Sequence, residues 1–505
     1  MYNALKKYAD TNPIPFHMPG HKLGRGLPKE LLGDLSVLDL TELPGTDNLF
    51  YPMETIKEAQ ILAANAFGAD RTYFLVNGST GGIHAMIMTI CKPKDKLIVA
   101  RDCHKSVVNG MLIADVNPVY ISPEYDDEFG ISLSITPSQV EKAFKDNPDA
   151  VGLLITRPNY YGVCCDIEKI AKIVQEHSKI LAVDEAHGAH LIFSGRLPVS
   201  AMDAGADICV QSAHKTLPAF TQGAYLHVKT NEFKTNRIDT EKLEYNFRLL
   251  MTSSPSYIIL ASLDIARSVM QNYGEGMLDE LLNNLDKFYK NILKTEGIKT
   301  LKEKYSLFNE PESDNMINKT NAENSYDETR IVINFRDVGL SGFEAADILR
   351  KQFNIQVEMS DMYNVICIST VSDTVKELET LRNALRSIAV KYGQEINSKK
   401  QSESNNNNEF KMVSPADAIT KIPDLPAQKI RPNEAAAKDK VWIGISDAEG
   451  MVCAEMVVPY PPGVPVICPG EIILDDTISY ICSIIKLGGN VTGLKDNSKI
   501  CVIRG

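Results

Sequence analysis

The sequence predicts an α/β protein whose main domain is a mostly parallel sheet, followed by a smaller α/β domain and a C-terminal α+β region. Two observations lead to this prediction. Strand-like apolar runs alternate with helical segments from about residue 70 to residue 230, which is typical of a mainly parallel sheet covered by helices. The alternation resumes over 330–395, after a long helix that begins near Tyr257, and predicts the second domain.

The strands of the main domain are predicted from short apolar runs. We expect them at 72–76, 96–100, 118–121, 151–156, 180–184, 206–210 and 223–228. The helices are predicted from apolar residues three and four positions apart, as at Ile56, Ala59, Leu62 and Ala63. We expect them at 56–67, 83–90, 137–144, 167–177 and 257–271.

The same patterns divide the rest of the chain. Residues 1–12 predict an amphipathic helix, 447–458 predict extended chain, and the polar run 397–408 predicts a flexible linker. In the second domain we expect strands at 330–335, 355–359 and 365–369 and helices at 342–353 and 373–392. The predicted units are an arm (1–50), a large domain (51–300), a small domain (301–395), a linker (396–440) and a C-terminal domain (441–505).

The composition of the chain argues against several classes of protein, among them nucleic-acid-binding, membrane and disulfide-rich secreted proteins. The chain has 505 residues and a net charge of −12, which argues against nucleic acid or an anionic membrane as the main partner. No stretch has the length of a membrane-spanning helix, and the N-terminus lacks the apolar core of a signal peptide. Ten cysteines without disulfide-module spacing indicate a reducing, cytoplasmic location. Cys164 and Cys165 are adjacent and no CxxC pair occurs, so we expect no metal site.

A glycine- and hydroxyl-rich turn follows the strand at 72–76. Its sequence is Asn77-Gly78-Ser79-Thr80-Gly81-Gly82, and the next predicted helix begins directly after it. A helix start presents free backbone N–H groups and a positive dipole end, so this turn predicts a phosphate site. The alternative is a plain helix cap, which Ser and Thr also favour.

Three further side chains follow predicted strands and should share one edge of the sheet. His104 comes after the strand at 96–100, Asp184 ends the strand at 180–184, and Lys215 follows the strand at 206–210. Ligands bind outside the carboxyl ends of strands in such sheets. A lysine that forms a Schiff base, with a carboxylate that keeps a pyridine nitrogen protonated, is the pair that pyridoxal 5'-phosphate (PLP) requires.

The motifs that contain these residues occur in the order of one known family. They are Gly78-Ser79-Thr80-Gly81, Cys103-His104-Lys105-Ser106, Asp184-Glu185-Ala186-His187 and Ser212-Ala213-His214-Lys215. With them the chain resembles the PLP-dependent ornithine/lysine/arginine decarboxylases, which have the aspartate-aminotransferase fold (fold type I). The stretches 16–22, Tyr460-Pro461-Pro462-Gly463 and Pro469-Gly470-Glu471 resemble the short, mostly Gram-positive branch.

The resemblance implies a role for each motif residue. Lys215 forms the Schiff base, Asp184 pairs with the pyridine nitrogen, and His104 stacks on the ring and is a candidate proton donor. Ala186 and His187 lie against the ring's other side or edge. The residues implied to hold the phosphate are Gly78, Ser79, Thr80, Ser212 and His214, with Thr252 and Ser253 contributed by a second subunit.

The implied reaction is α-decarboxylation of a basic amino acid, arginine, lysine or ornithine, to a polyamine-pathway amine and carbon dioxide. Family analogy favours arginine. The implied assembly is a homodimer or a dimer of dimers with the site at the interface. The carboxylates expected to bind the substrate's side-chain cation are Glu471, Glu455 and Glu42.

Two other functions stay open on the sequence. The first is a PLP-dependent aminotransferase, aldolase or lyase, because Arg330, Arg336 and Arg350 of the small domain offer anchors for an α-carboxylate. The second is an inactive homologue that regulates a partner. The intact Lys215 and Asp184 argue against the second.

Overall fold

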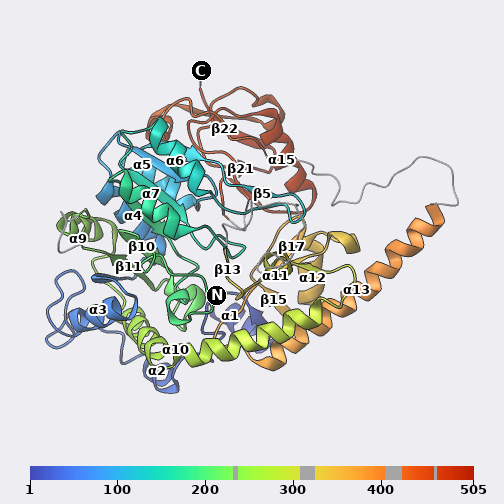
Figure 1. Cartoon of the computed structure of the whole chain (residues 1–505), viewed down its shortest axis with the longest axis horizontal. Coiled ribbons are helices and arrows are strands. Elements are labelled where there is room, and N and C mark those ends of the chain that lie inside the picture. Colours follow the sequence, from blue (N-terminus) through green and yellow to red (C-terminus); the bar gives the residue numbers. More distant parts are fainter. Residues whose placement is uncertain (231–236, 307–324, 404–422, 460–462, 505) are drawn as a thin grey trace.

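The computed structural model describes residues 1–230, 237–306, 325–403, 423–459 and 463–504. Its centre is a seven-stranded sheet (Figure 1). The strand order is β2 (Arg71–Leu75), β11 (Ala224–Val228), β10 (Ile208–Gln211), β9 (Ile180–Asp184), β7 (Gly152–Thr156), β3 (Lys96–Ala100) and β4 (Asn117–Ile121). The strands from β10 to β4 are parallel, whereas β11 is antiparallel to both neighbours. The predicted mostly parallel sheet is therefore confirmed.

Helices cover both faces of this sheet because successive strand residues point to opposite sides. Val99 packs in the cluster that contains α4 (Gly78–Ile90), α5 (Lys105–Ile113) and α9 (Thr240–Leu250). Its neighbour Ile98 packs in the cluster that contains α6 (Pro137–Asp146) and α7 (Ile167–Glu176). Nearly every side chain of β3, β7 and β9 is buried, as expected for parallel strands between two helical layers.

The small domain is a four-stranded antiparallel sheet. Its order is β12 (Lys299–Thr300), β14 (Arg330–Asn334), β17 (Asn364–Ile368) and β16 (Met359–Ser360). The helices α12 (Gly342–Phe353) and α13 (Val375–Glu403) pack on it, and α10 (Tyr257–Ile292) runs beside α13 from the large domain (Figure 1). The arm joins this domain through β1 (Ile14–Phe16), which pairs in parallel with β15 (Ile355–Val357).

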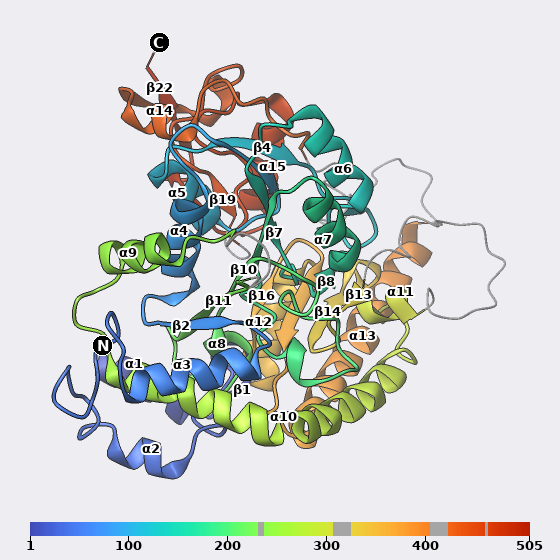
Figure 2. The same cartoon turned by 60° about the vertical axis from the view of Figure 1, so that its left-hand side comes forward.

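The C-terminal region has its own sheet and core. Strands β18 (Lys440–Gly444), β22 (Lys499–Ile503) and β21 (Leu494–Lys495) pack with α15 (Asp475–Lys486). In Figures 1 and 2 this region, drawn in red, lies beside the large domain, and α14 (Pro432–Ala437) contacts α5.

The other α-helices and β-strands have twelve residues or fewer. They are α1 (Tyr2–Asp10), α2 (Lys29–Asp34), α3 (Thr55–Ala66), α8 (Ala213–Thr216), α11 (Leu301–Ser306), β5 (Tyr125–Asp126), β6 (Ile131–Ser132), β8 (Val163–Cys164), β13 (Ser325–Tyr326), β19 (Val458–Pro459) and β20 (Val491–Thr492). In the described chain, no helix is long and apolar enough to cross a membrane.

Several predicted boundaries differ from the structure. Helix α4 begins at Gly78, so the predicted turn is the helix's first turn, where Gly, Ser and Thr are tolerated. Helix α10 continues to Ile292 because apolar residues keep helical spacing beyond 271. The predicted extended stretch 447–458 contains isolated β-bridges and only the start of β19.

Two parts of the predicted linker, 396–403 and the segment from 423, have regular structure. Residues 396–403 continue α13, and the segment from 423 carries α14 and a bridge between Gln428 and Glu471. The remainder, 404–422, lies outside the described residues, as do residues 460–462 of the Tyr-Pro-Pro-Gly motif. The domain boundaries stay a prediction.

Candidate active site

The predicted catalytic pair lies at the carboxyl edge of the parallel sheet. Strands β9 and β10 are neighbours, and Val210 stands opposite Asp184 in their register. Lys215 follows on the short helix α8, directly after β10. The two side chains are close enough that the Asp184 charge favours the ammonium form of Lys215, while the Lys215 charge opposes the rise in the pKa of Asp184.

Lys215 is surrounded by protein. Burial lowers the pKa of its amine to about 8, and nearby Asp184 and Glu358 limit the fall. Its Nζ lies 3.0 Å from His187 Nε2 and 5.9 Å from the centre of the Tyr160 ring. A buried lysine with a lowered pKa is a candidate for covalent chemistry with a carbonyl group.

The partners of His187 fix which of its nitrogens carries the proton. Burial and the charges of Lys215 and Arg330 lower its pKa well below the usual value, so the ring is neutral near pH 7. The Arg330 guanidinium donates to His187 Nδ1 at 3.1 Å, and the same Nη2 also donates to the His187 carbonyl at 3.1 Å. Since Nδ1 accepts, Nε2 carries the hydrogen and donates to Lys215. This arrangement requires Lys215 to accept with its lone pair and therefore favours the neutral amine.

Asp184 is only 2% exposed, and the backbone N–H of Ala186 donates to its Oδ1 at 3.2 Å. Burial raises its pKa, and Lys215 and the Ala186 N–H oppose the rise. A buried carboxylate with so few partners is suited to pair with a protonated ring nitrogen. Ala186 and His187 are also buried, next to Asp184 in sequence.

His104 is the N-cap of α5 at the end of β3. Burial, with the charges of Lys215 and Lys105, lowers its pKa to about 3, so the ring is neutral near pH 7. The N–H of Ser106 donates to His104 Nδ1 at 3.3 Å, which leaves the hydrogen on Nε2. An uncharged flat ring with one N–H can lie against an aromatic cofactor and donate a hydrogen bond.

The first turn of α4 has the features of an anion site. Asn77 is its N-cap but makes no capping hydrogen bond, so its side chain does not occupy the backbone amides of this turn. The hydroxyls of Ser79 and Ser212 lie 2.7 Å apart and bring α4 and α8 together. Gly78 has a φ of +71°, which favours glycine, and its N–H donates to Gln222 O. Uncapped amides and two adjacent hydroxyls can hold a phosphate group.

The other predicted phosphate residues differ in position. His214 Nδ1 lies 3.0 Å from the Gly223 carbonyl, and burial lowers the pKa of this ring to about 4. Thr80 is exposed at the start of α4. Thr252 and Ser253 are exposed on the loop after α9. Their predicted contact across a subunit interface stays a prediction.

The three carboxylates predicted to bind the substrate cation lie in different surroundings. Glu42 is exposed in the arm, and Glu455 pairs with Lys440 at 3.4 Å. Glu471 is buried, and its Oε2 accepts from Arg101 at 3.0 Å and from the Cys468 N–H at 2.7 Å. The charges that act on Lys215 are instead Asp184, Glu358 and Arg330.

Sequence reasoning missed three contributors. Glu358 belongs to the small domain, and Tyr160 lies in the loop after β7, with its ring centre 4.8 Å from that of His187. Glu185 accepts from Gln211 at 2.7 Å and lies 3.7 Å from Arg157. These two contacts hold the turn that follows β9 in place. The sequence indicates Glu185 only through its place next to Asp184. Glu358 and Tyr160 could not be predicted, because their contacts with the site join segments that are distant in the chain.

A cavity of about 750 Å³ lies at the junction of the three folded parts and is bounded toward Lys215 by Tyr160. Tyr160 and Asp102 line it from the large domain, Asp361 from the small domain, and Tyr480 from the C-terminal region. A small molecule of amino-acid size fits this volume.

Comparison with known proteins agrees with this geometry. Residues 1–377 match the major domain of the Orn/Lys/Arg decarboxylases, and residues 416–498 match their C-terminal domain. The chain is 36% identical over 502 residues to an arginine decarboxylase of Bacillus subtilis, covering 99% of this chain and 96% of the relative.

Solved structures share the fold at low sequence identity. Lysine decarboxylase A from Pseudomonas aeruginosa has a TM-score of 0.76 at 20% identity, over 92% of this chain and 74% of that one. A structure of SPT with PLP has a TM-score of 0.55 at 12% identity, over 73% of this chain and 86% of that one. The fold is therefore that of the fold-type I enzymes. Together, the two matched domains and the full-length relative show that the chain belongs to the Orn/Lys/Arg decarboxylase family.

Proposed function

We propose that this protein is a PLP-dependent decarboxylase that converts arginine to agmatine and carbon dioxide. The observation that supports it most directly is the placement of Lys215 beside Asp184, in a chain similar along its whole length to an arginine decarboxylase. Lysine and ornithine are the competing substrates, since the relatives also include lysine decarboxylases.

The residues of the site fit the cofactor. Lys215 would hold its aldehyde carbon, Asp184 its ring nitrogen, and the first turn of α4 with Ser79 and Ser212 its phosphate. The uncapped amides of α4 and the adjacent hydroxyls of Ser79 and Ser212 support the phosphate position. When bound, PLP supplies an electron sink for the pair released from the breaking bond between Cα and the carboxylate.

The chain's own groups would manage the protons. His187 Nε2–H, set by Arg330, favours a neutral Lys215 amine, which is the form that reacts with a carbonyl. The buried Asp184 carboxylate would keep its partner nitrogen protonated. The Lys215 ammonium would return a proton to Cα after carbon dioxide leaves; His104, a neutral ring with its hydrogen on Nε2, would need to be protonated first to act as the alternative donor.

We further propose a cytoplasmic homodimer that acts in polyamine biosynthesis. Every cysteine is a free thiol, which suits a reducing compartment. The exposed loop with Thr252 and Ser253 is available to complete a phosphate site in a second subunit.

The test is product analysis with each basic amino acid. Purified protein loaded with PLP is incubated with arginine, lysine or ornithine, and the amine is identified by mass spectrometry while carbon dioxide is measured. We expect agmatine without any requirement for a keto acid. The Lys215→Ala variant should lose both the reaction and the visible absorbance of bound cofactor. An active, yellow Lys215→Ala protein would contradict the assignment.

A further inference from the structure

The arm segment 14–22 connects the small domain to the turn that carries Lys215. The N–H of Gly20 donates to the carbonyl of His214 at 2.7 Å, and Thr370 donates to the Gly20 carbonyl at 3.0 Å. A Cβ on Gly20 would lie 2.6 Å from the Leu217 carbonyl oxygen, so the two backbones are in direct contact. The position of the arm therefore depends on both domains.

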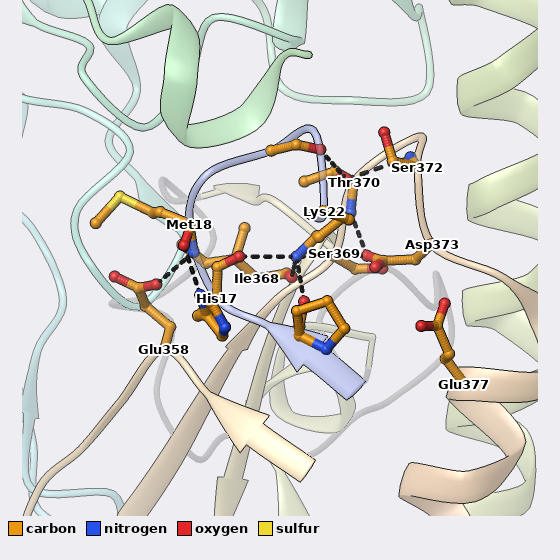
Figure 3. A network of polar contacts seen from close by, with 12 residues as sticks. His17, Met18, Lys22, Glu358, Ile368, Ser369, Thr370, Ser372, Asp373 and Glu377 are labelled. Carbon is orange, nitrogen blue, oxygen red and sulfur yellow. Dashed lines mark hydrogen bonds and ion pairs between the residues drawn. The ribbon is translucent and has the colours of Figure 1, made fainter. Parts of the chain in front are cut away.

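A buried ammonium group fixes the arm in this place. Lys22 is 1% exposed and donates to the carbonyls of Pro15 at 2.8 Å, His17 at 3.1 Å and Ile368 at 2.8 Å, as Figure 3 shows. Its Nζ also lies 3.8 Å from Asp373. The arm cannot shift without breaking several contacts of one desolvated cation.

The arm in turn holds one carboxylate of the small domain. The N–H of Met18 donates to Glu358 Oε2 at 2.8 Å, and in Figure 3 Glu358 lies on the opposite side of Lys22 from Asp373 and Glu377. Within the described part of the chain, no hydrogen bond or ion pair is formed by Glu358 Oε1. Glu358 is half-buried, and its charge acts on Lys215 and on Arg330.

Other carboxylates also act on the nearby cations. Lys22 is paired with Asp373. Asp327 is the carboxylate with the largest effect on Arg330, and Asp184 has that position for Lys215. His17 does not add a cation, because burial lowers its pKa. Glu358 is thus a carboxylate additional to the one that acts most strongly on each of these groups, and a half-buried carboxylate with one oxygen unpaired favours a cationic ligand.

We propose that Glu358 binds the cationic end of the substrate's side chain, with Oε2 held by the arm and Oε1 directed to the substrate. The assignment rests on the proposed function, because it names the group that recognises a basic side chain. The competing carboxylate is Asp102, which is 7% exposed and lines the cavity that reaches Tyr160.

Equilibrium binding of two matched ligands tests the proposal. Agmatine carries a guanidinium group, whereas N-carbamoylputrescine has the same length and a neutral urea group. Titration calorimetry with PLP-loaded protein gives the dissociation constant of each. In Glu358→Gln the amide oxygen can still accept from Met18, so the arm contact remains and only the charge is removed.

We expect Glu358→Gln to weaken agmatine binding about ten- to a hundredfold, the range for a charge-assisted hydrogen bond, and to leave the neutral ligand within about twofold. Glu377→Gln is the matched control, since Glu377 contacts the same arm through Arg25 but lies across Lys22 from Glu358. It should leave the preference for agmatine unchanged. Glu358→Asp keeps the charge and should retain the preference even where affinity falls.

Equal weakening of both ligands, with a lowered melting temperature, would show that Glu358 is only structural and would overturn the proposal. So would loss of the preference in Asp102→Asn but not in Glu358→Gln. Failure of the proposed function is a separate result: the wild-type protein would then release no carbon dioxide from arginine, lysine or ornithine, whatever the calorimetry shows.

Discussion

The buried ion pair between Arg101 and Glu471 attaches the C-terminal region to the end of β3, two residues before Cys103. Arg101 also donates to the carbonyls of Pro465 at 2.7 Å and Val466 at 3.3 Å. We predict that Arg101→Met destabilises the attachment, because a buried Glu471 carboxylate loses its cation while its Oε1 has no hydrogen-bond partner among the described residues.

The magnitude follows from the two ways in which Glu471 can respond. Breaking a buried pair by removing one partner costs about 3–5 kcal/mol. Glu471 can instead take up a proton, which for a carboxyl with an ordinary pKa near 4.3 costs about 3.7 kcal/mol at pH 7 and about 1 kcal/mol at pH 5. Glu471 takes whichever response costs less, an unpaired charge or the uptake of a proton. We therefore expect Arg101→Met to lower the free energy of unfolding by about 3–4 kcal/mol at pH 7 and about 1 kcal/mol at pH 5.

The sign of the pH dependence follows from linkage. Burial raises the pKa of Glu471, and Arg101 opposes the rise, so removing Arg101 raises it further. A carboxyl whose pKa is higher in the folded than in the unfolded state destabilises the protein increasingly as pH rises above the unfolded value. The difference between variant and wild type should therefore grow from pH 5 to pH 7.

The assay uses the chain's single tryptophan, Trp442, which lies in β18 of the C-terminal region. Its fluorescence during urea denaturation reports unfolding of this region, and the midpoint shift multiplied by the slope gives the free-energy difference. The double variant Arg101→Met with Glu471→Gln carries no buried charge and should lose the pH dependence. A double variant as pH-dependent as Arg101→Met, or equal losses at pH 5 and pH 7, would refute the reasoning.

Two further predictions concern the arm and the lysine. Lys22→Met should lower the stability by about 3–5 kcal/mol, because Asp373 and three carbonyls lose a buried cation, and proteolysis of the arm should become faster; an unchanged cleavage rate would contradict this. Arg330→Met should raise the pKa of Lys215, near 8 in the wild type, by about one unit, since it removes a nearby cation and frees His187 to accept from an ammonium. Acylation of Lys215 in cofactor-free protein, measured against pH by mass spectrometry, checks it; an unshifted profile would count against the hydrogen-bond assignment.

The large domain could be predicted well from the sequence because its strands are buried on both faces. The strands at 96–100 and 180–184 and the helix at 342–353 have the predicted bounds. Continuous apolar runs of strand length leave little ambiguity in such a sheet. The family and the fold class were therefore confirmed, and the Asp184–Lys215 juxtaposition followed from the order of two neighbouring strands.

The polar residues around Asp184 and Lys215 could not be predicted from runs of apolar residues. Glu358, Arg330 and Tyr160 come from three separate segments, and only the packing of the small domain on the large one brings their charges or rings to Lys215. For Glu471 the sequence indicates the residue but not its partner. Its motif marks it as notable, but the sequence does not show that Arg101 is its partner.

The three histidines of the site are neutral for one physical reason, and this determines how charge is distributed there. Burial lowers the pKa of His104, His187 and His214, so the local charges near pH 7 belong to lysine, arginine and the carboxylates. A neutral imidazole presents one donor and one acceptor, and each ring here has its Nδ1 occupied by a neighbouring group. Hydrogen bonds thus fix the orientation of the three rings. The charges of Lys215, Asp184 and Glu358 determine the electrostatic potential at the position of a cationic substrate.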